Sequence, residues 1–399
     1  MQIRKSIATW DDWTDYFKEW QKDIGVSIPE AENFIMTPIY TEKVSNEIEF
    51  GDFKGQHKWE RVGQIPNQQM RDALLQLVFV QGDTEFASTE QQRRLLNNVP
   101  HDYDRYAAVR IMLEEMRHGV QMANVLVQHF GSSGKLEAKK LLERRASEAF
   151  PETKNPRLLG AFNVAVNNWI DFYTYTCFVD RDGKFQLTML APCAFAPLAR
   201  SAGPMLKEEA FHLGSGNDGL VRIIKGGKVP VRILQKYLNK WISVAMDLFG
   251  KDESGTAEWA YVWSLKSRFD EDKQRAAGNT AFDRKELNHH NRMIYFGECL
   301  DIVNRLNSLV AAGQPKLTVP DEKFHRGIGR FAGQPYSVTG QLLSADEYKK
   351  HLFEVLPNEK DEAELASIFA DPSWIEDKKI PADPWAYQKA VRAGTNDKA

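Results

Sequence analysis

Glu115-Met-Arg-His118 and Glu209-Ala-Phe-His212 are two copies of one short motif, Glu-x-x-His. Each copy follows another carboxylate at nearly the same distance. Glu85 lies 30 positions before Glu115, and Asp180 lies 29 positions before Glu209. This pattern therefore predicts two similar helical hairpins, each of which supplies two carboxylates and one histidine.

This spacing is typical of a four-helix bundle that holds two iron ions. In such a bundle, two helices each provide one Glu and the other two each provide a Glu-x-x-His. Carboxylate oxygens with a few imidazoles suit iron or manganese, whereas structural zinc more often takes thiolates. We therefore predict an all-α, ferritin-like four-helix bundle with a non-haem di-iron site. The predicted metal ligands are Glu85, Glu115, His118, Asp180, Glu209 and His212, and the four carboxylates are also the predicted catalytic residues.

The motif alone is weak evidence, because Glu-x-x-His also occurs at Glu286/His289 and Glu322/His325. Neither late copy has a carboxylate 29 or 30 residues upstream, so both are interpreted as ordinary surface charge. An isolated early copy would usually be a solvated charge beside a core histidine. Buried carboxylates are costly unless they are paired or bound to metal, and four of them on apolar helix faces favour a metal site.

The composition is that of a large globular chain. It has 399 residues, of which 42% are hydrophobic and 27% charged, and its net charge of −3 gives no reason to expect nucleic-acid binding. Three widely spaced cysteines form neither a disulfide framework nor a Cys-x-x-Cys motif. We find no signal peptide and no apolar run long enough for a membrane span. A cytoplasmic protein without a membrane partner is expected.

The chain is predicted to form a single domain, 1–399, built in four consecutive parts. An N-terminal cap spans 1–66, with one helix near 10–24. The di-iron bundle spans 67–225 and contains four helices. The first starts at 67, and the other three cover about 102–130, 157–180 and 203–224. Between the second and third helices, the chain is broken at Gly131-Ser-Ser-Gly134 and Asn155-Pro156. Additional helices near 229–249 and 283–312 lie in 226–312. An extended C-terminal tail, 313–399, is rich in proline and glycine and should wrap the surface.

The third bundle helix carries two acids, and helical geometry selects one of them. Asp171 and Asp180 are nine residues apart, which is about 900° of rotation, so they lie on opposite faces. Only Asp180 shares the apolar stripe of Trp169 and Tyr173, which are interpreted as core or pocket wall. Asp is one methylene shorter than Glu, so this helix must approach the metals closely or bend, and Arg181-Asp182-Gly183 would permit a bend. Gln81, one turn before Glu85, is either a packed amide or a residue acting near the metals.

Longer stretches of the sequence resemble a known family, the oxygenase component of benzoyl-CoA 2,3-epoxidase. The resemblance covers roughly residues 45–360 and implies the same six iron ligands, including an Asp on the third helix. It departs before Phe50 and at Phe86 and Phe211, which leaves the acyl substrate open. The stretches that carry it include Phe50-Gly-Asp-Phe-Lys-Gly-Gln56, Gln81-Gly-Asp-Thr-Glu85, Glu114-Glu-Met-Arg-His118, Asp180-Arg-Asp-Gly-Lys-Phe-Gln-Leu187, Glu208-Glu-Ala-Phe-His212 and Ala332-Gly-Gln-Pro335.

The resemblance implies a di-iron monooxygenase that epoxidises or hydroxylates an aromatic ring with O₂, in the first place the ring of an aromatic acyl-CoA such as benzoyl-CoA. The chain has no Gly-x-Gly-x-x-Gly after a strand and no cysteine set for an iron–sulfur cluster. A separate NAD(P)H-dependent reductase is therefore the expected partner. The alternatives are a di-iron oxygenase acting on a free aromatic acid or an amine, and a ferritin-like iron-oxidising protein. The long chain disfavours the last, because storage subunits need only the bundle.

Overall fold

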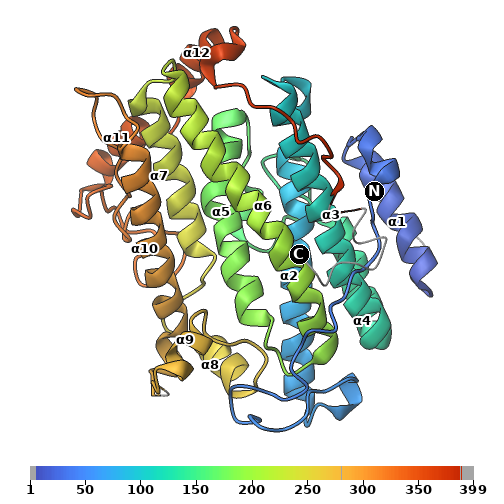
Figure 1. Cartoon of the computed structure of the whole chain (residues 1–399). Coiled ribbons are helices and arrows are strands. Elements are labelled where there is room, and N and C mark those ends of the chain that lie inside the picture. The colour runs from blue at the N-terminus through green and yellow to red at the C-terminus, as the bar shows by residue number, and fades with distance from the viewer. Residues whose placement is uncertain (1–5, 280, 387, 389–399) are drawn as a thin grey trace.

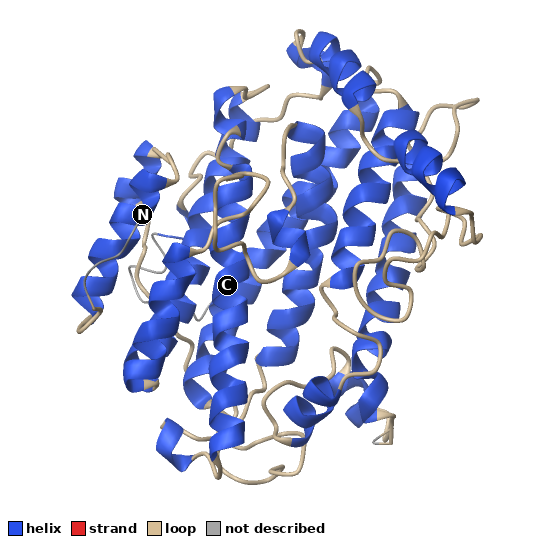
Figure 2. Ribbon diagram, turned by 180° about the vertical axis from the view of Figure 1, so that it is seen from behind, coloured by secondary structure: helices blue, strands red, loops and turns tan. Residues whose placement is uncertain are grey.

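The computed structural model describes residues 6–279, 281–386 and 388, and within these ranges all regular secondary structure is helical. In these ranges the backbone forms helices and loops, and its only β-type pairings are isolated bridges (Figure 2). The predicted all-α class is confirmed. None of the helices in these ranges is long and apolar enough to cross a membrane.

Four long helices lie side by side in the middle of the molecule (Figure 1). They form two hairpins, because α2 packs along α3 and α5 packs along α6. Their starts follow from local chemistry: the side chains of Asn67 and Asn168 accept hydrogen bonds from the first free N–H groups of α2 and α5. The bounds are α2 Gln68–Gln92, α3 Asp102–His129, α5 Trp169–Leu190 and α6 Ala196–Gly226.

The predicted limits of the third and fourth helices were wrong. The third was expected over 157–180, but only a short 3₁₀ turn, Gly160–Asn163, precedes the cap at Asn168, and α5 then continues through Gly183 to Leu190. The sequence Arg181-Asp182-Gly183 therefore does not end the helix. The fourth helix begins at Ala196 rather than near 203, and it includes Pro204 in its interior.

A helix also occupies the stretch that was interpreted as a break. Gly131 has a φ of +56°, and the chain turns there from α3 directly into α4, Gly131–Glu143. A Cβ at Gly134 would lie 1.9 Å from the carbonyl oxygen of Leu126, so only glycine lets α4 begin this close to α3. The two glycines therefore create a sharp corner between two helices.

Further helices cover both sides of the bundle (Figure 1). On the side of α2 and α3 lie α4 and the predicted N-terminal helix α1, Trp10–Asp23, which starts in a capping box at Thr9. On the side of α5 and α6 lie α7, Val231–Asp247, and α10, Leu287–Asn307, close to the predicted positions. The shorter elements are α8 Gly255–Val262, α9 Glu271–Ala276 and the 3₁₀ turns Pro29–Asn33, Val62–Gln64, Leu95–Asn97, Arg284–Glu286 and Pro372–Trp374.

The described part of the C-terminal tail contacts the helices, and it contains two helices that were not predicted, α11 Ala345–Val355 and α12 Glu359–Ile368. Capping boxes at Ser344 and Asn358 start them. Asp361 pairs with Lys236 of α7 at 2.7 Å. Further on, the carbonyl oxygen of Pro384 accepts a hydrogen bond from Tyr106 of α3 at 3.2 Å. The tail thus runs from the α7 side of the bundle to the α3 side.

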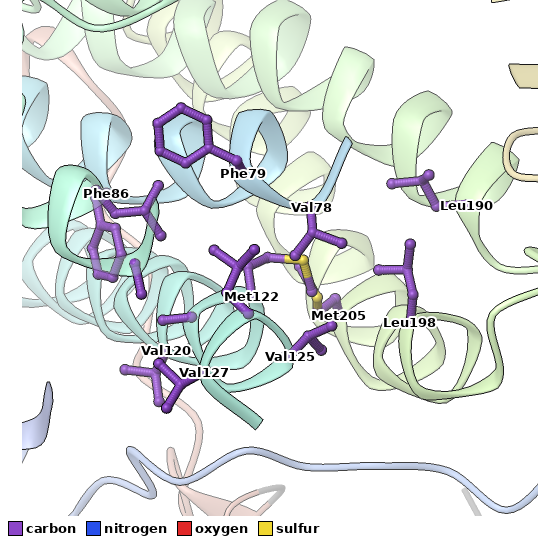
Figure 3. Packing of buried hydrophobic residues seen from close by; sticks show 14 of the residues in the cluster. Val78, Phe79, Phe86, Val120, Met122, Val125, Val127, Leu190, Leu198 and Met205 are labelled. Carbon is purple, nitrogen blue, oxygen red and sulfur yellow. The ribbon is translucent and has the colours of Figure 1, made fainter. Parts of the chain in front are cut away.

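The apolar core has two main parts, one for each hairpin. The first is built around α1 to α4 with the adjoining ends of α5 and α6, and Figure 3 shows part of it, including Val78, Met122 and Met205. The second joins α5 and α6 to α7 and α10, with Trp241 and Tyr295 fully buried. The acids and histidines of the repeated motif come from α2, α3, α5 and α6, so they lie where the two halves meet.

Candidate metal centre

The structure brings all six predicted ligands together in the centre of the bundle. Glu85 comes from α2, Glu115 and His118 from α3, Asp180 from α5, and Glu209 and His212 from α6. Each of them is buried, with at most 7% of its surface exposed. Their ligand atoms form two groups, each within 4.8 Å, and the two groups share Glu115. The first group is Glu85, Glu115, His118 and Glu209, and the second is Glu115, Asp180 and His212.

The distances divide the cluster into two halves, each around Nδ1 of one histidine. One carboxylate, Glu209, faces both histidines: its Oε1 lies 3.7 Å from Nδ1 of His118, and its Oε2 lies 3.4 Å from Nδ1 of His212. Glu85 Oε2 lies 3.4 Å from Nδ1 of His118, and Glu115 Oε1 lies 3.3 Å from Nδ1 of His212. The two imidazole centres are 5.9 Å apart. Glu209 therefore faces both imidazoles, and Glu115 belongs to both groups of possible ligand atoms.

Without bound cations, the carboxylates of this cluster repel one another. Burial raises the pKa of Glu115 well above its ordinary value, and the nearby Glu85 carboxylate raises it further. Burial likewise raises the pKa of Asp180, with the Glu209 carboxylate as the next cause. Four buried carboxylates beside two imidazoles are costly as charges unless they take up protons or are balanced by cations.

Unsatisfied atoms in the cluster fit bound metal. Nδ1 of His118, Nδ1 of His212, Oδ2 of Asp180 and Oε2 of Glu209 have no hydrogen-bond partner within the described ranges, although all are buried. Buried polar atoms normally have a partner. A pair of divalent cations would give each of these atoms one, so the residues present fit a dinuclear metal group.

The two histidines are held by acids that the prediction did not assign. His118 donates from Nε2 to Glu208 at 2.8 Å, and His212 donates from Nε2 to Glu114 at 3.0 Å. Because a carboxylate accepts at each Nε2, that nitrogen carries the proton and Nδ1 offers its lone pair to the cluster. Each supporting acid comes from the opposite hairpin. The signal was in the sequence, since an acid directly precedes the ligand Glu in both motif copies.

Other sequence interpretations are settled by contacts. Gln81 donates to Oε1 of Glu85 at 2.5 Å, so its amide is hydrogen-bonded beside the cluster. Asp171 points away, as predicted, and accepts hydrogen bonds from Lys240 and Trp241 of α7 at 2.7 and 2.8 Å. Tyr173 is a core residue, fully buried and hydrogen-bonded through its hydroxyl to Asp104. Neither late motif copy belongs to the cluster: His289 approaches Asp252, and His325 contacts Tyr348.

A pocket of about 700 Å³ leads from the cluster to the surface. Its inner end is formed by Glu85, Glu115, Asp180 and Glu209, and its walls by α2 and α5. The outer end lies near α8, where Trp259 is 52% exposed. The apolar wall residues include Leu77, Val80, Leu159, Phe162, Val179, Leu190, Leu248 and Trp263. An apolar pocket with a few polar groups at its end is the usual form of a small-molecule site.

Known proteins resemble this chain over most of its length. Residues 61–287 match the family described as phenylacetic acid catabolic protein. The chain is 36% identical to benzoyl-CoA oxygenase component B of Aromatoleum evansii, over 80% of this chain and 75% of that protein. It is 28% identical to one subunit of the 1,2-phenylacetyl-CoA epoxidase of Escherichia coli strain K12, over 30% of this chain and 40% of that protein.

Proposed function

We propose that this chain, which belongs to the phenylacetic acid catabolic protein family, acts on an aromatic acyl-CoA and inserts one atom of O₂ into its ring. The chain is an oxygenase, because the relatives that share its sequence are named as an oxygenase and an epoxidase. The observation that carries the proposal further is the pocket, which ends at a cluster of four carboxylates and two histidines.

The residues that would hold two iron ions are Glu85, Glu115, His118, Asp180, Glu209 and His212. Iron bound there would supply O₂ activation. The protein's own contribution is placement: Glu208 and Glu114 orient the imidazoles, and Gln81 holds one oxygen of Glu85. The apolar walls keep bulk water from the reacting atoms and give the flat face of an aromatic ring something to pack against.

The length of the pocket supports a thioester substrate over a short free acid. Its α2 wall reaches from Asp72 to Glu85, thirteen residues, which is about 20 Å of helix at 1.5 Å per residue. A free aromatic acid would fill only the inner part. An acyl group attached to an extended carrier arm would use the whole length and leave through the open end.

We further propose that the electrons come from a separate NAD(P)H-dependent reductase. Both relatives are named as one part of a larger enzyme. The three cysteines, at 177, 193 and 299, are buried and far apart in sequence, so they offer no iron–sulfur ligand set. A cytoplasmic location would provide both NAD(P)H and acyl-CoA.

The test is a single turnover with ¹⁸O₂. The iron-loaded protein, reduced chemically and given benzoyl-CoA, should yield a product with one labelled oxygen atom in the ring. The isolated chain with NADPH and O₂ should be inert until a reductase is added. Label that appears only in water, across a panel of aromatic acids, amines and CoA thioesters, would favour an iron-oxidising protein. Steady NADPH oxidation by the chain alone would contradict the need for a partner.

A further inference from the structure

One cation faces the pocket between the carboxylate cluster and the surface. Lys266 is the sole Lys, Arg or His among the described residues that line it. Its ammonium donates to Oε1 of Gln186, which also lines the pocket. Among the described residues this is the one hydrogen bond of the ammonium group, which has three N–H donors. Two donors are therefore left for a molecule in the pocket.

The partner of Lys266 is itself fixed in direction. Gln186 donates from its amide nitrogen to Oδ1 of Asp182 at 2.9 Å, one helical turn earlier on α5. Because that nitrogen is occupied, the amide oxygen faces Lys266. Burial lowers the pKa of Lys266, and the nearby Asp182 charge opposes this change. A polar row of Asp182, Gln186 and Lys266 thus interrupts walls that are otherwise mostly apolar.

The backbone around Lys266 is held in place. Ser264 has a φ of +60°, a conformation that L-residues seldom adopt, and its hydroxyl donates to the carbonyl oxygen of Phe50 at 2.6 Å. Ser267 donates its N–H to the carbonyl oxygen of Met189, near the end of α5, at 2.9 Å. Both serines are buried. The loop that presents Lys266 is therefore anchored on both sides of the lysine.

The height of this row along the pocket fits an acyl group. Gln186 lies six residues beyond Asp180 on α5, which is about 9 Å along the helix axis towards the open end. An aromatic ring placed beside Asp180 and Glu209 would carry its acyl carbon outward from the metal position. The acyl oxygen would then reach the level of Gln186 and Lys266, while the rest of a thioester would continue towards Trp259.

We infer that Lys266 anchors the substrate by donating a hydrogen bond to its acyl oxygen, and that this contact decides which edge of the ring faces the metal cluster. The inference rests on the proposed function for the aromatic acyl substrate. The same ammonium group could donate to the carbonyl oxygen of a thioester or to a carboxylate oxygen of a free acid. The pocket length favours the thioester, and the experiment uses both.

The test compares Lys266→Met with Lys349→Met, a matched control that removes an exposed lysine on α11, away from the pocket. Calorimetric titration with benzoyl-CoA and with benzoate gives the affinity without any need for turnover. Lys266→Met should weaken benzoyl-CoA binding about 10- to 100-fold, the usual effect of losing a hydrogen bond to a charged group. Lys349→Met should bind as the wild type does. Lys266→Gln, which keeps a neutral donor, should fall between them and serves if Lys266→Met does not fold.

A second readout separates anchoring from a general effect on folding. In a single turnover, Lys266→Met should give a wider mixture of ring positions and less product per electron consumed, with unchanged iron content. Unchanged affinity and an unchanged product pattern in Lys266→Met would overturn the inference while leaving the proposed function intact. If the wild type binds benzoate but not benzoyl-CoA, and Lys266→Met loses benzoate, the thioester proposal fails and the anchor stands. If the wild type binds neither, both fail.

Discussion

The two hairpins of the bundle supply the same kinds of proposed metal ligand, but the residues that hold these ligands differ between the hairpins. In one direction Glu208 of α6 holds His118 and pairs with Arg117, whose side chain is fully buried. In the other direction Glu114 of α3 holds His212 and pairs with Arg110 at 2.9 Å, and Arg110 keeps 16% of its side-chain surface exposed. One supporting pair is sealed inside the bundle and the other reaches towards its surface.

The upstream carboxylates of the two hairpins, Glu85 and Asp180, also differ in their hydrogen-bond partners. Glu85 has an amide partner in Gln81, whereas Oδ2 of Asp180 has no hydrogen-bond partner in the described chain. The shorter Asp lies near Gly183, where an added Cβ would come 3.6 Å from the Glu209 carboxylate. A repeated motif therefore gives near-symmetric ligands, while the residues around each copy decide how firmly each ligand is held. Paired substitutions in the two halves test this difference.

The largest contrast is expected between the two acids of α5. Asp180→Asn should leave the fold intact and remove most of the bound iron, because it withdraws a negative ligand from the cluster. Asp171→Asn should keep the iron but lower the free energy of unfolding by about 1–3 kcal/mol, because Lys240 and Trp241 lose a charged acceptor. Metal analysis and chemical denaturation of both variants check this. Equal iron loss in the two variants would contradict the assignment of Asp180, rather than Asp171, to the helix face that points to the cluster.

The two arginines behind the supporting acids come next. Arg117→Met should destabilise the metal-free protein by about 3–5 kcal/mol, because it leaves the buried Glu208 charge without its cation. Arg110→Met should cost less, about 1–3 kcal/mol, because Glu114 is buried but Arg110 lies partly at the surface, so that water can enter where the guanidinium was. Urea unfolding of the two variants measures the difference. Similar losses would show that the two supports are equally sealed.

The supporting acids themselves should act mainly on metal affinity. Glu208→Gln and Glu114→Gln should each weaken iron binding about 10- to 100-fold, because each imidazole loses the carboxylate that orients it. The loss should be greater for Glu208→Gln, because Glu208 pairs with the fully buried Arg117, whereas Glu114 pairs with the partly exposed Arg110. Competition with a chelator gives both affinities, and Glu47→Gln at the surface is a control. An affinity unchanged from the wild type in both variants would contradict a supporting role.

The smallest effect is expected at Gln81. Gln81→Leu should cost about 1 kcal/mol of iron-binding free energy, the worth of one hydrogen bond to Glu85. Gln76→Leu, an exposed change nearer the outer end of the same pocket, should leave iron binding alone. Chelator competition again gives the numbers. Equal effects of the two substitutions on iron affinity would contradict a specific contribution of the Gln81–Glu85 hydrogen bond.

The bundle and the helix faces of its six proposed ligands could be predicted from the sequence, because both depend on local periodicity. Glu-x-x-His puts two ligands one turn apart on any helix, and a nine-residue step separates Asp171 from Asp180 whatever surrounds them. The start of α2 was predictable for the same reason, since the helical period begins at Asn67, whose side chain caps the helix. The breaks were less reliable. Gly131-Ser-Ser-Gly134 looks like a loop, yet it opens α4, because close contact with α3 overrides the helix-breaking tendency of glycine.

Other features depend on contacts between residues far apart in the chain. Hydrogen bonds between the two hairpins join His212 to Glu114 and His118 to Glu208 across the bundle. No spacing in the sequence predicts these pairs. Lys266 belongs to a loop well beyond the bundle, and it lines the pocket only because the serines on either side of it are tied to Phe50 and to α5. The sequence by itself determined which residues share a helix face, since the backbone repeats every 3.6 residues. Only the tertiary structure decided which faces meet, because that follows from how separate helices bury their apolar surface together.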